Sequence, residues 1–239
     1  MNYNPPYYQE LFEAYGFQLY FQQICFALDP SKPLQAKFYN RHEEFAKNPK
    51  FSVRHIKKND LEKAATDFTT VYNAAWAGHG GGKTMEYRTV LKMFKSMKPV
   101  MQEGLIWFVY YEEEPIAMWV NLPDLNQWFK HLKGKFGLLQ KLQFLYHKTF
   151  SPNKRFVGLV FGIVPKFQSK GVDAYLIVEA QEKIEQEYNY TAYEMQWIGD
   201  FNPKMINVAE NLGTYRSRVL TTYRYLFDRS KPFERHPMV

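Results

Sequence analysis

The chain has 239 residues, of which 46% are hydrophobic and 23% charged, the ordinary balance of a globular protein. No stretch reaches the roughly 18–20 uncharged apolar residues that a membrane span needs, so we expect no membrane partner. The formal charge is +7, but Lys and Arg are spread along the chain, and their densest stretch, residues 130–155, favours a solvated helix face over nucleic-acid binding.

Cysteine usage and the N-terminal residues bear on location. The single cysteine, Cys25, cannot form an internal disulfide, and it lies in an apolar stretch typical of a buried thiol. Such usage fits a reducing compartment. The first 16 residues have no basic start followed by an apolar segment, so we expect no signal peptide and a cytoplasmic protein.

The predicted elements begin with a helix over residues 7–14, preceded by Pro5 and Pro6 and followed by Gly16. A strand over residues 18–28 comes next. Three prolines and many charges over residues 29–49 predict a linker with some helix.

Further elements follow from residue 51. Alternation predicts a strand over residues 51–56, and helical spacing predicts helices from residue 61 to 75 and from 85 to 96. Two strands, 105–111 and 116–122, form a hairpin around a tight turn, and residues 123–150 are an insertion with two short helical patterns. The remaining prediction is strand 156–163, helix 172–187, strand 191–198, a helix from Asn202 to Gly213, and strand 219–227.

The segment from Val164 to Val172 is the most informative. A buried strand runs into a short loop, which runs directly into a helix. The first amides of a helix have no partner within it and, with the helix dipole, attract anions. Gly171 lets a phosphate approach the backbone, while Lys166 and Lys170 add charge. These features predict a pyrophosphate site.

The segment VPKFQSKGVDAYL resembles the acetyl-CoA motif of the GNAT superfamily of N-acetyltransferases: Gln or Arg, two residues, Gly, one residue, then Gly or Ala. Gln168 and Gly171 match, and Asp173 stands at the third position. That carboxylate would repel a pyrophosphate unless it points away, although the first helical turn also suits a dipole-stabilising acid.

Other segments resemble bacterial tandem GNAT-like proteins. Residues 4–17 resemble the end of their N-terminal half. Fixed points of their C-terminal half are matched by VYNAAW (71–76), LPDLNQ (122–127), YEMQWIGDFNPKM (193–205) and YRY (223–225). A weak repeat supports two related domains, because residues 2–16 and 200–213 share the order Asn-Pro, helix, Gly.

The resemblance implies an α/β fold of the GNAT type, with a mixed, mostly antiparallel central sheet flanked by helices. It implies that residues 1–30 are the C-terminal tail of a preceding GNAT-like domain, residues 31–50 a linker, and residues 51–239 the acyltransferase domain. Because strand 18–28 would be an exposed edge, we expect it to pair with the main sheet or with a second copy in a homodimer.

The resemblance also implies a co-substrate, acetyl-CoA or another acyl-CoA. The residues expected to hold it are Ile163, Val164, Lys166, Gln168, Ser169, Lys170, Gly171, Val172 and Asn202. Val164 would act through its backbone, where the strand splays from its neighbour. Asn202 would contact the pantetheine or acyl end, or else only cap its helix.

For catalysis, such enzymes use a base or water relay to take the amine's proton, and often a Tyr on the last helix to protonate the thiolate. Four residues before the helix-ending glycine this chain has Ala209, so the usual acid is missing. Tyr215 and Tyr193 are the candidate replacements. Glu194 is the candidate base, with a satisfied polar strand residue as the alternative.

The acceptor is expected to be a small-molecule or peptide amine. By analogy, Trp76, Asp124 and Asn126 would bind it, and the glycines between 78 and 82 would form a loop beside it. The stretch GHGGGKT (78–84) fails as a P-loop because Ala77 stands where a glycine is needed. Histidine spacing and the single cysteine predict no metal site.

The sequence therefore predicts an N-acetyltransferase that moves an acetyl group directly from acetyl-CoA to an amine. The alternative is a catalytically inactive GNAT-fold module that binds a ligand or regulates, which Ala209 and the absent upstream half favour.

Overall fold

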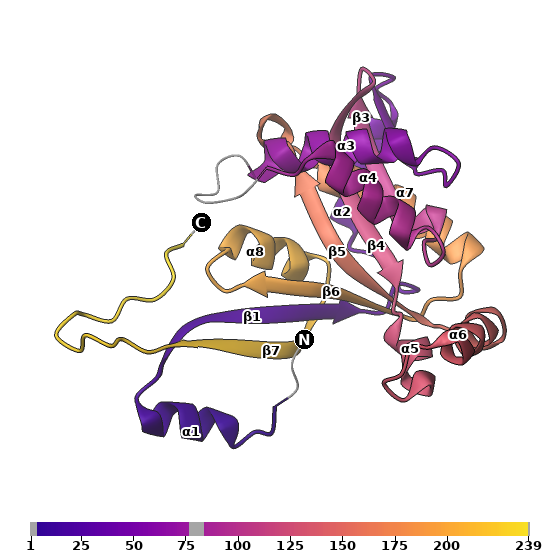
Figure 1. Cartoon of the computed structure of the whole chain (residues 1–239). Coiled ribbons are helices and arrows are strands. Elements are labelled where there is room, and N and C mark those ends of the chain that lie inside the picture. Colours follow the sequence, from indigo (N-terminus) through magenta and orange to yellow (C-terminus); the bar gives the residue numbers. More distant parts are fainter. Residues whose placement is uncertain (1–3, 77–83, 239) are drawn as a thin grey trace. The chain divides into compact units, whose positions relative to one another are not determined.

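The computed structural model describes residues 4–76 and 84–238, which form two compact units (Figure 1). The larger unit is Leu28–Glu194, and the smaller combines Met1–Ala27 with Met195–Val239. Over the described residues, no helix has both the length and the apolar character to cross a membrane.

Four antiparallel strands form the sheet of the larger unit. In the order β2-β3-β4-β5 they are Phe51–His55, Ile106–Tyr111, Glu114–Pro123 and Arg155–Ile163. The predicted hairpin is β3 and β4. Its turn contains Glu112 and Glu113, with φ of 48° and 69°, the positive values of the tight turns that match strand twist.

The larger unit contains six α-helices and three short 3₁₀ segments among its described residues. The α-helices are α2 Ala36–Ala46, α3 Leu61–Trp76, α4 Tyr87–Met97, α5 Asn126–Phe129, α6 Leu138–Phe150 and α7 Val172–Glu187. The 3₁₀ segments are η1 Glu103–Leu105, η2 Lys130–Leu132 and η3 Pro165–Phe167. The predicted insertion over 123–150 thus contains α5, η2 and α6.

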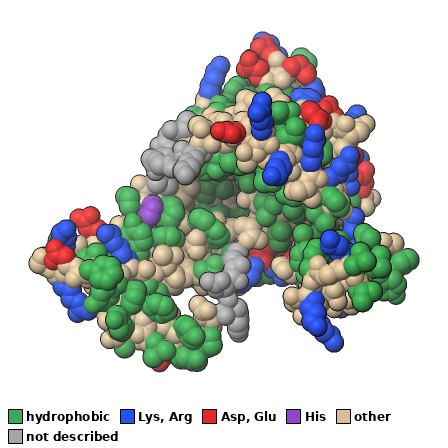
Figure 2. All heavy atoms as spheres, in the orientation of Figure 1, with side chains coloured by type: hydrophobic (Ala, Val, Ile, Leu, Met, Phe, Trp, Pro, Cys, Tyr) green, Lys and Arg blue, Asp and Glu red, His purple; other side chains and the backbone are tan. Residues whose placement is uncertain are grey.

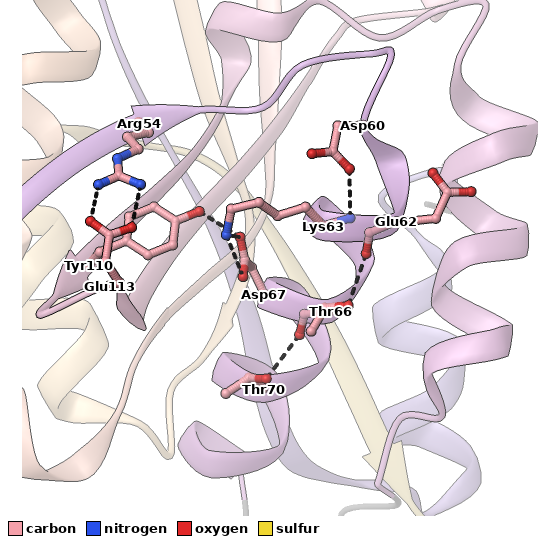
Figure 3. Close-up of polar contacts among 9 residues, drawn as sticks. All are labelled: Arg54, Asp60, Glu62, Lys63, Thr66, Asp67, Thr70, Tyr110 and Glu113. Atoms are coloured by element: carbon pink, nitrogen blue, oxygen red, sulfur yellow. Dashed lines mark hydrogen bonds and ion pairs between the residues drawn. The ribbon is translucent and has the colours of Figure 1, made fainter.

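The main core lies between α3, α4 and the sheet, where Phe68, Phe94, Phe108 and Met118 are almost fully buried. The apolar residues of α3 recur at helical spacing, so one face of the helix packs onto the strands. A polar contact crosses this core: buried Asp67 of α3 meets Tyr110 of β3 and Lys63 (Figure 3).

Helix α2 lies in the stretch predicted as a linker, and it packs against α7. His42 Nε2 lies 2.8 Å from Glu179 Oε1, and the rings of Phe45 and Tyr175 stack with centroids 5.6 Å apart. Phe38 is the buried residue of the helix. Residues 36–46 are therefore a packed part of the larger unit.

The smaller unit holds α1 (Tyr8–Tyr15), β1 (Gln18–Leu28), α8 (Pro203–Asn211) and β7 (Tyr215–Arg224). Strand β6, Ala192–Gly199, begins in the larger unit and continues into this one. Ile24, Phe26, Ile198 and Ala209 form its core. Helix α1 ends at Gly16 in the left-handed conformation, as the sequence predicts.

Strand β7 corrects one prediction. The sequence predicts a strand over 219–227 from its apolar residues, but β7 begins at Tyr215 and ends at Arg224. The antiparallel ladder with β1 starts with Ala27 opposite Tyr215. Backbone pairing therefore extends through a charged stretch that apolar pattern alone leaves out. The predicted fold class, mixed α/β with a mostly antiparallel sheet and flanking helices, is confirmed.

Candidate functional site

The loop between β5 and α7, residues 164–171, doubles back on itself. Phe167 N donates to Val164 O at 2.8 Å, and Gln168 Nε2 donates to Ile163 O at 2.9 Å. Val164 N also donates to Ile116 O of β4, so both backbone groups of Val164 are engaged. Gln168, which sequence analysis predicts to hold the cofactor, thus closes the loop.

The start of α7 presents a set of backbone donors. Ser169 has φ of 58° and Gly171 has φ of 93°, values that turn successive amides toward one side. Across the described residues, the amides of 169–174 donate to no protein acceptor. The amides of the predicted residues Ser169, Lys170, Gly171 and Val172 are therefore unpaired at the positive end of the α7 dipole.

Three cations lie around these donors. Lys166 and Lys170 are exposed on the loop, and each ammonium group lies 5.7 Å from the ring centroid of Phe167. The third is Arg41 of α2, whose Cδ lies 3.1 Å from where a Cβ on Gly171 would stand and whose Nη1 pairs with Glu44 at 2.9 Å. No local pattern in the sequence indicates that Arg41 lies beside Gly171, because this depends on the packing of α2 on α7.

A cleft of about 460 Å³ adjoins the loop. Its walls are aromatic side chains from α2, β2, β3 and η3, with two lysines and two polar residues at the rim. The lining residues are Glu44, Phe45, Asn48, Phe51, Tyr111, Lys166, Phe167 and Lys170. Flat apolar walls beside cations suit an aromatic ring system that carries phosphates.

Asp124 and Glu194 are both predicted site residues, and the structure brings them together through Arg155. The Arg155 guanidinium forms an ion pair with Glu194, and its Nε lies 3.6 Å from Asp124 Oδ2. Glu194 is 1% exposed and Asp124 is 7% exposed, whereas the Arg155 side chain is 36% exposed. We call these three residues the carboxylate–arginine cluster.

Asp124 has a further structural role at the start of α5. Its Oδ1 accepts from the backbone and the side-chain amide of Asn126, both at 3.1 Å, and its Oδ2 accepts from Gln127 Nε2 at 3.0 Å. Asn126, predicted to bind substrate, is exposed, and its side-chain amide donates to Asp124. The carboxylate of Asp124 is thus held in a fixed position by its neighbours and Arg155.

Trp76, the third predicted acceptor residue, ends α3. Its ring stacks on Tyr72 with centroids 4.6 Å apart, and it lies so close over β5 that a Cβ at Gly162 would meet it at 2.7 Å. The glycines between 78 and 82, predicted to form a loop at the acceptor, lie outside the described residues.

Tyr193, a candidate acid, is buried. Its Oη accepts a hydrogen bond from Trp119 Nε1 at 3.0 Å, and its ring stacks on Phe156 at 4.6 Å. Burial raises the pKa of the Tyr193 hydroxyl well above its usual value. These contacts favour a packing role, because a general acid must reach the leaving group.

The remaining predicted residues belong to the smaller unit. Tyr215 begins β7 and is 65% exposed. Asn202 caps α8, with its side-chain oxygen accepting from Met205 N at 3.1 Å. Ala209, which the sequence resemblance places where GNAT enzymes often have an acid, is fully buried in that unit's core. The part of the chain that the structure describes holds no group of three or more His, Cys, Asp and Glu suited to a metal.

No known protein-family model matches the chain. Its fold is that of the GCN5-related N-acetyltransferases. A GCN5-related N-acetyltransferase from Sphaerobacter thermophilus superimposes with a TM-score of 0.55 over 90% of this chain and 55% of its own, at 10% identity. A tandem GNAT protein from the clavulanic acid biosynthesis pathway gives 0.54 over 93% and 59%, also at 10% identity.

Two curated proteins resemble the chain in sequence. Bacterial ceramide synthase of Caulobacter vibrioides is 25% identical over 172 residues, 69% of this chain and 45% of that protein. Protein YghO of Escherichia coli is 21% identical over 167 residues, 69% of this chain and 43% of that protein. The chain therefore spans less than half the length of these relatives.

Proposed function

We propose that the chain is an acyltransferase domain that binds an acyl-CoA and transfers its acyl group to an amine. The observation that carries the proposal is the set of unpaired amides at residues 169–174, with Lys166, Lys170 and Arg41 around it. A pyrophosphate has the charge and the acceptor atoms that this arrangement suits. The GNAT-type fold supports the same assignment.

The neighbouring cleft supports a nucleotide rather than a simple phosphate. Phe45, Phe51, Tyr111 and Phe167 offer flat faces within reach of the same lysines. The adenine ring of CoA would stack there while its phosphates meet the amides and cations. An isolated phosphate has no ring that could stack on the aromatic walls.

The sequence analysis predicts acetyl as the transferred acyl group. Similarity to a protein named ceramide synthase favours a longer acyl chain and a long-chain amine acceptor, because a ceramide is an amide of that kind. We therefore propose N-acylation with a fatty acyl-CoA, and acetyl-CoA is the competing donor.

In the proposed reaction the amine nitrogen attacks the thioester carbon. A C–N bond forms, the C–S bond breaks, the amine loses a proton and the CoA thiolate gains one. Glu194 is our candidate proton acceptor, with Asp124 attracting the cationic amine. Arg155 forms an ion pair with Glu194, and its Nε lies 3.6 Å from Asp124 Oδ2, so one cation contacts both carboxylates.

A ligand-binding module without turnover is the second candidate. It is favoured by Ala209, which stands where GNAT enzymes often have the tyrosine that protonates the thiolate. Such a module would bind an acyl-CoA but would not transfer its acyl group.

The test is calorimetric titration of the chain with CoA, acetyl-CoA and dodecanoyl-CoA. We expect saturable binding that Lys166→Ala/Lys170→Ala weakens by about tenfold or more, since each charge-assisted contact is worth roughly 1.5–3 kcal/mol before solvent screening. Lys92 is an exposed lysine of α4, and Lys92→Ala is the matched control, which is expected to bind the CoA ligands with unchanged affinity.

Release of free CoA is then followed with long-chain and short-chain amines. Release that depends on the amine supports transfer, and the donor chain length separates fatty acyl from acetyl transfer. Binding without release from any amine favours the second candidate. No binding of any CoA by the unmodified chain would refute both.

A further inference from the structure

Helix α6 exposes most of its apolar residues. Leu138, Leu139, Leu142, Leu145, Tyr146 and Phe150 are each 52–77% exposed, and we call them the leucine face. Phe144 is the buried residue of the helix, where it packs with Trp128 and Leu132. The helix therefore contacts its own unit with the opposite side and presents the leucine face to the exterior.

The leucine face is continuous. With roughly 100° of rotation per residue, its six members fall within an arc of about 140°, centred near Leu142, while Phe144 falls on the other side. An isolated exposed leucine needs no explanation, but a contiguous apolar surface on one helix marks an interaction site. Figure 2 shows hydrophobic side chains gathered where Figure 1 draws α5 and α6, with Lys and Arg side chains beside them.

The charge around the leucine face has one sign. Residues 125–153 contain no Asp or Glu, and their lysines are Lys130, Lys133, Lys135, Lys141 and Lys148. Lys148 donates to Pro99 O, while the other four form no ion pair with any described residue. A solvated helix of an ordinary soluble protein would carry both signs.

Lysines border the leucine face on both sides. Lys141 lies next to Leu138 and Leu145 on the helical projection. On the other side, Gln143 Nε2 donates to His131 O, and the rings of His131 and His147 stack with centroids 4.0 Å apart. Those contacts hold η2, and with it Lys130, along that border.

We propose that the leucine face is a membrane-surface docking site for anionic lipid. A basic amphipathic helix lies flat in the lipid interface, with its leucines and aromatic residues among the acyl chains and its lysines at the headgroups. At 13 residues, α6 is too short to span a bilayer, so this contact is peripheral. The proposal revises the sequence-based expectation of no membrane partner, and it is independent of acyl transfer.

Charge favours lipid over a second copy of the chain. In a symmetric dimer the same patch meets itself, so the bordering lysines of both copies would be brought together without a compensating carboxylate. An anionic bilayer supplies both the apolar phase and the negative charge. Helix α1 offers an internal contrast, because its exposed Leu11 lies between Glu10 and Glu13.

The test is flotation of the full chain with vesicles of pure phosphatidylcholine and of an equal phosphatidylglycerol–phosphatidylcholine mixture. We expect binding to the anionic vesicles that salt weakens. Leu138→Gln/Leu142→Gln/Leu145→Gln should weaken it by about tenfold or more, because glutamine keeps the helix but removes the apolar face. Lys133→Ala/Lys135→Ala/Lys141→Ala should cost about fivefold per lysine, and only on the anionic vesicles.

Single Leu142→Gln, which should weaken binding less than the triple variant, has Leu11→Gln as its matched control, since the two leucines are 60% and 59% exposed. Leu11→Gln is expected to bind vesicles normally, and circular dichroism of each variant checks folding. Failure of the unmodified chain to float with any vesicle would overturn the proposal, as would binding that survives the triple Gln substitution. Leucine-dependent dimerisation by light scattering, without vesicle binding, would assign the face to self-association instead.

Discussion

The hydroxyl of Tyr110 donates a 2.5 Å hydrogen bond to Asp67 Oδ2, joining β3 to α3 inside the main core (Figure 3). Asp67 is 4% exposed, and the Lys63 ammonium lies 2.9 Å from the same oxygen. The carboxylate therefore keeps two donors in a place where an unpaired charge would be costly. Sequence spacing alone places Asp67 on the apolar face of a helix and does not indicate its hydrogen bond to Tyr110.

Removal of this hydrogen bond is expected to destabilise the larger unit. Tyr110→Phe leaves a buried carboxylate with one donor fewer, at a cost of about 1–3 kcal/mol in the free energy of unfolding. Urea denaturation followed by circular dichroism measures it. Tyr111→Phe is the matched control, because the partner of the Tyr111 hydroxyl is the exposed Lys50 and not a buried carboxylate, and a loss equal to that of Tyr110→Phe would contradict the assignment.

Stability is expected to fall at alkaline pH. Burial, followed by the hydrogen bond and charge of Asp67, raises the pKa of Tyr110, and burial raises the pKa of Tyr190 and Tyr193. A raised folded pKa means that the contribution is complete below the unfolded value of 10.0 and is lost as pH rises above it. Unfolding free energies measured from pH 8 to 11 should decline above about 10. Tyr110→Phe should make that decline shallower, and an unchanged slope would argue against Tyr110 as a contributor.

Gly171 is expected to be required for ligand binding beyond its effect on stability. An alanine there would adopt the unfavourable φ of 93° and crowd Arg41 at 3.1 Å, beside the unpaired amides. Gly134 has φ of 74° with nothing within 4 Å of its Cβ position, so Gly134→Ala carries similar backbone strain without the crowding. Both variants should lose about 1 kcal/mol of stability.

Only Gly171→Ala should also weaken acyl-CoA binding, by about tenfold or more in calorimetric titration. Equal affinity in the two variants would place the phosphates elsewhere.

Arg155 is expected to be the most sensitive residue of the carboxylate–arginine cluster. Arg155→Met removes the guanidinium from buried Glu194 and should cost about 3–5 kcal/mol, the typical effect of breaking a buried ion pair. Lys50→Met breaks the exposed pair with Glu112 and should change little. The free energies of unfolding of Arg155→Met and Lys50→Met are compared by thermal and urea denaturation.

A further variant tests whether the uncompensated charge of Glu194 causes the loss of stability. If Arg155→Met proves too unstable, the double variant Arg155→Met/Glu194→Gln removes both charges and should recover part of the loss. A double variant no more stable than the single one would show that the uncompensated charge of Glu194 is not the cause of the loss.

Local signals explain what was predictable. Helix α7 matches its predicted bounds, Val172 to Glu187, because its apolar spacing and the preceding glycine are both features of adjacent residues. Strand β1 also matches its predicted bounds, and Asn202 caps α8 as expected. The β3–β4 hairpin is present, but β4 begins at Glu114 and not at the predicted residue 116. Local pattern also predicts the unpaired backbone amides at the start of α7, since the first amides of a helix have no acceptor within it.

Contacts between distant segments explain what was missed. Arg41 approaches Gly171 only because α2 packs on α7, and Arg155 joins Asp124 to Glu194 only because β5 lies beside the residues that bear them. The start of β7 likewise depends on its ladder with β1. Each of these relationships joins residues far apart in the chain, with no periodicity between them.

The sequence by itself determined most element types and the GNAT-type fold class, since these depend on patterns among neighbouring residues, and the same patterns predict the pyrophosphate loop. The tertiary structure decided which charges pair, which tyrosine is buried, and that the apolar side of α6 faces outward. Helical periodicity shows that a helix has an apolar face, but only packing decides whether that face meets the core or remains exposed.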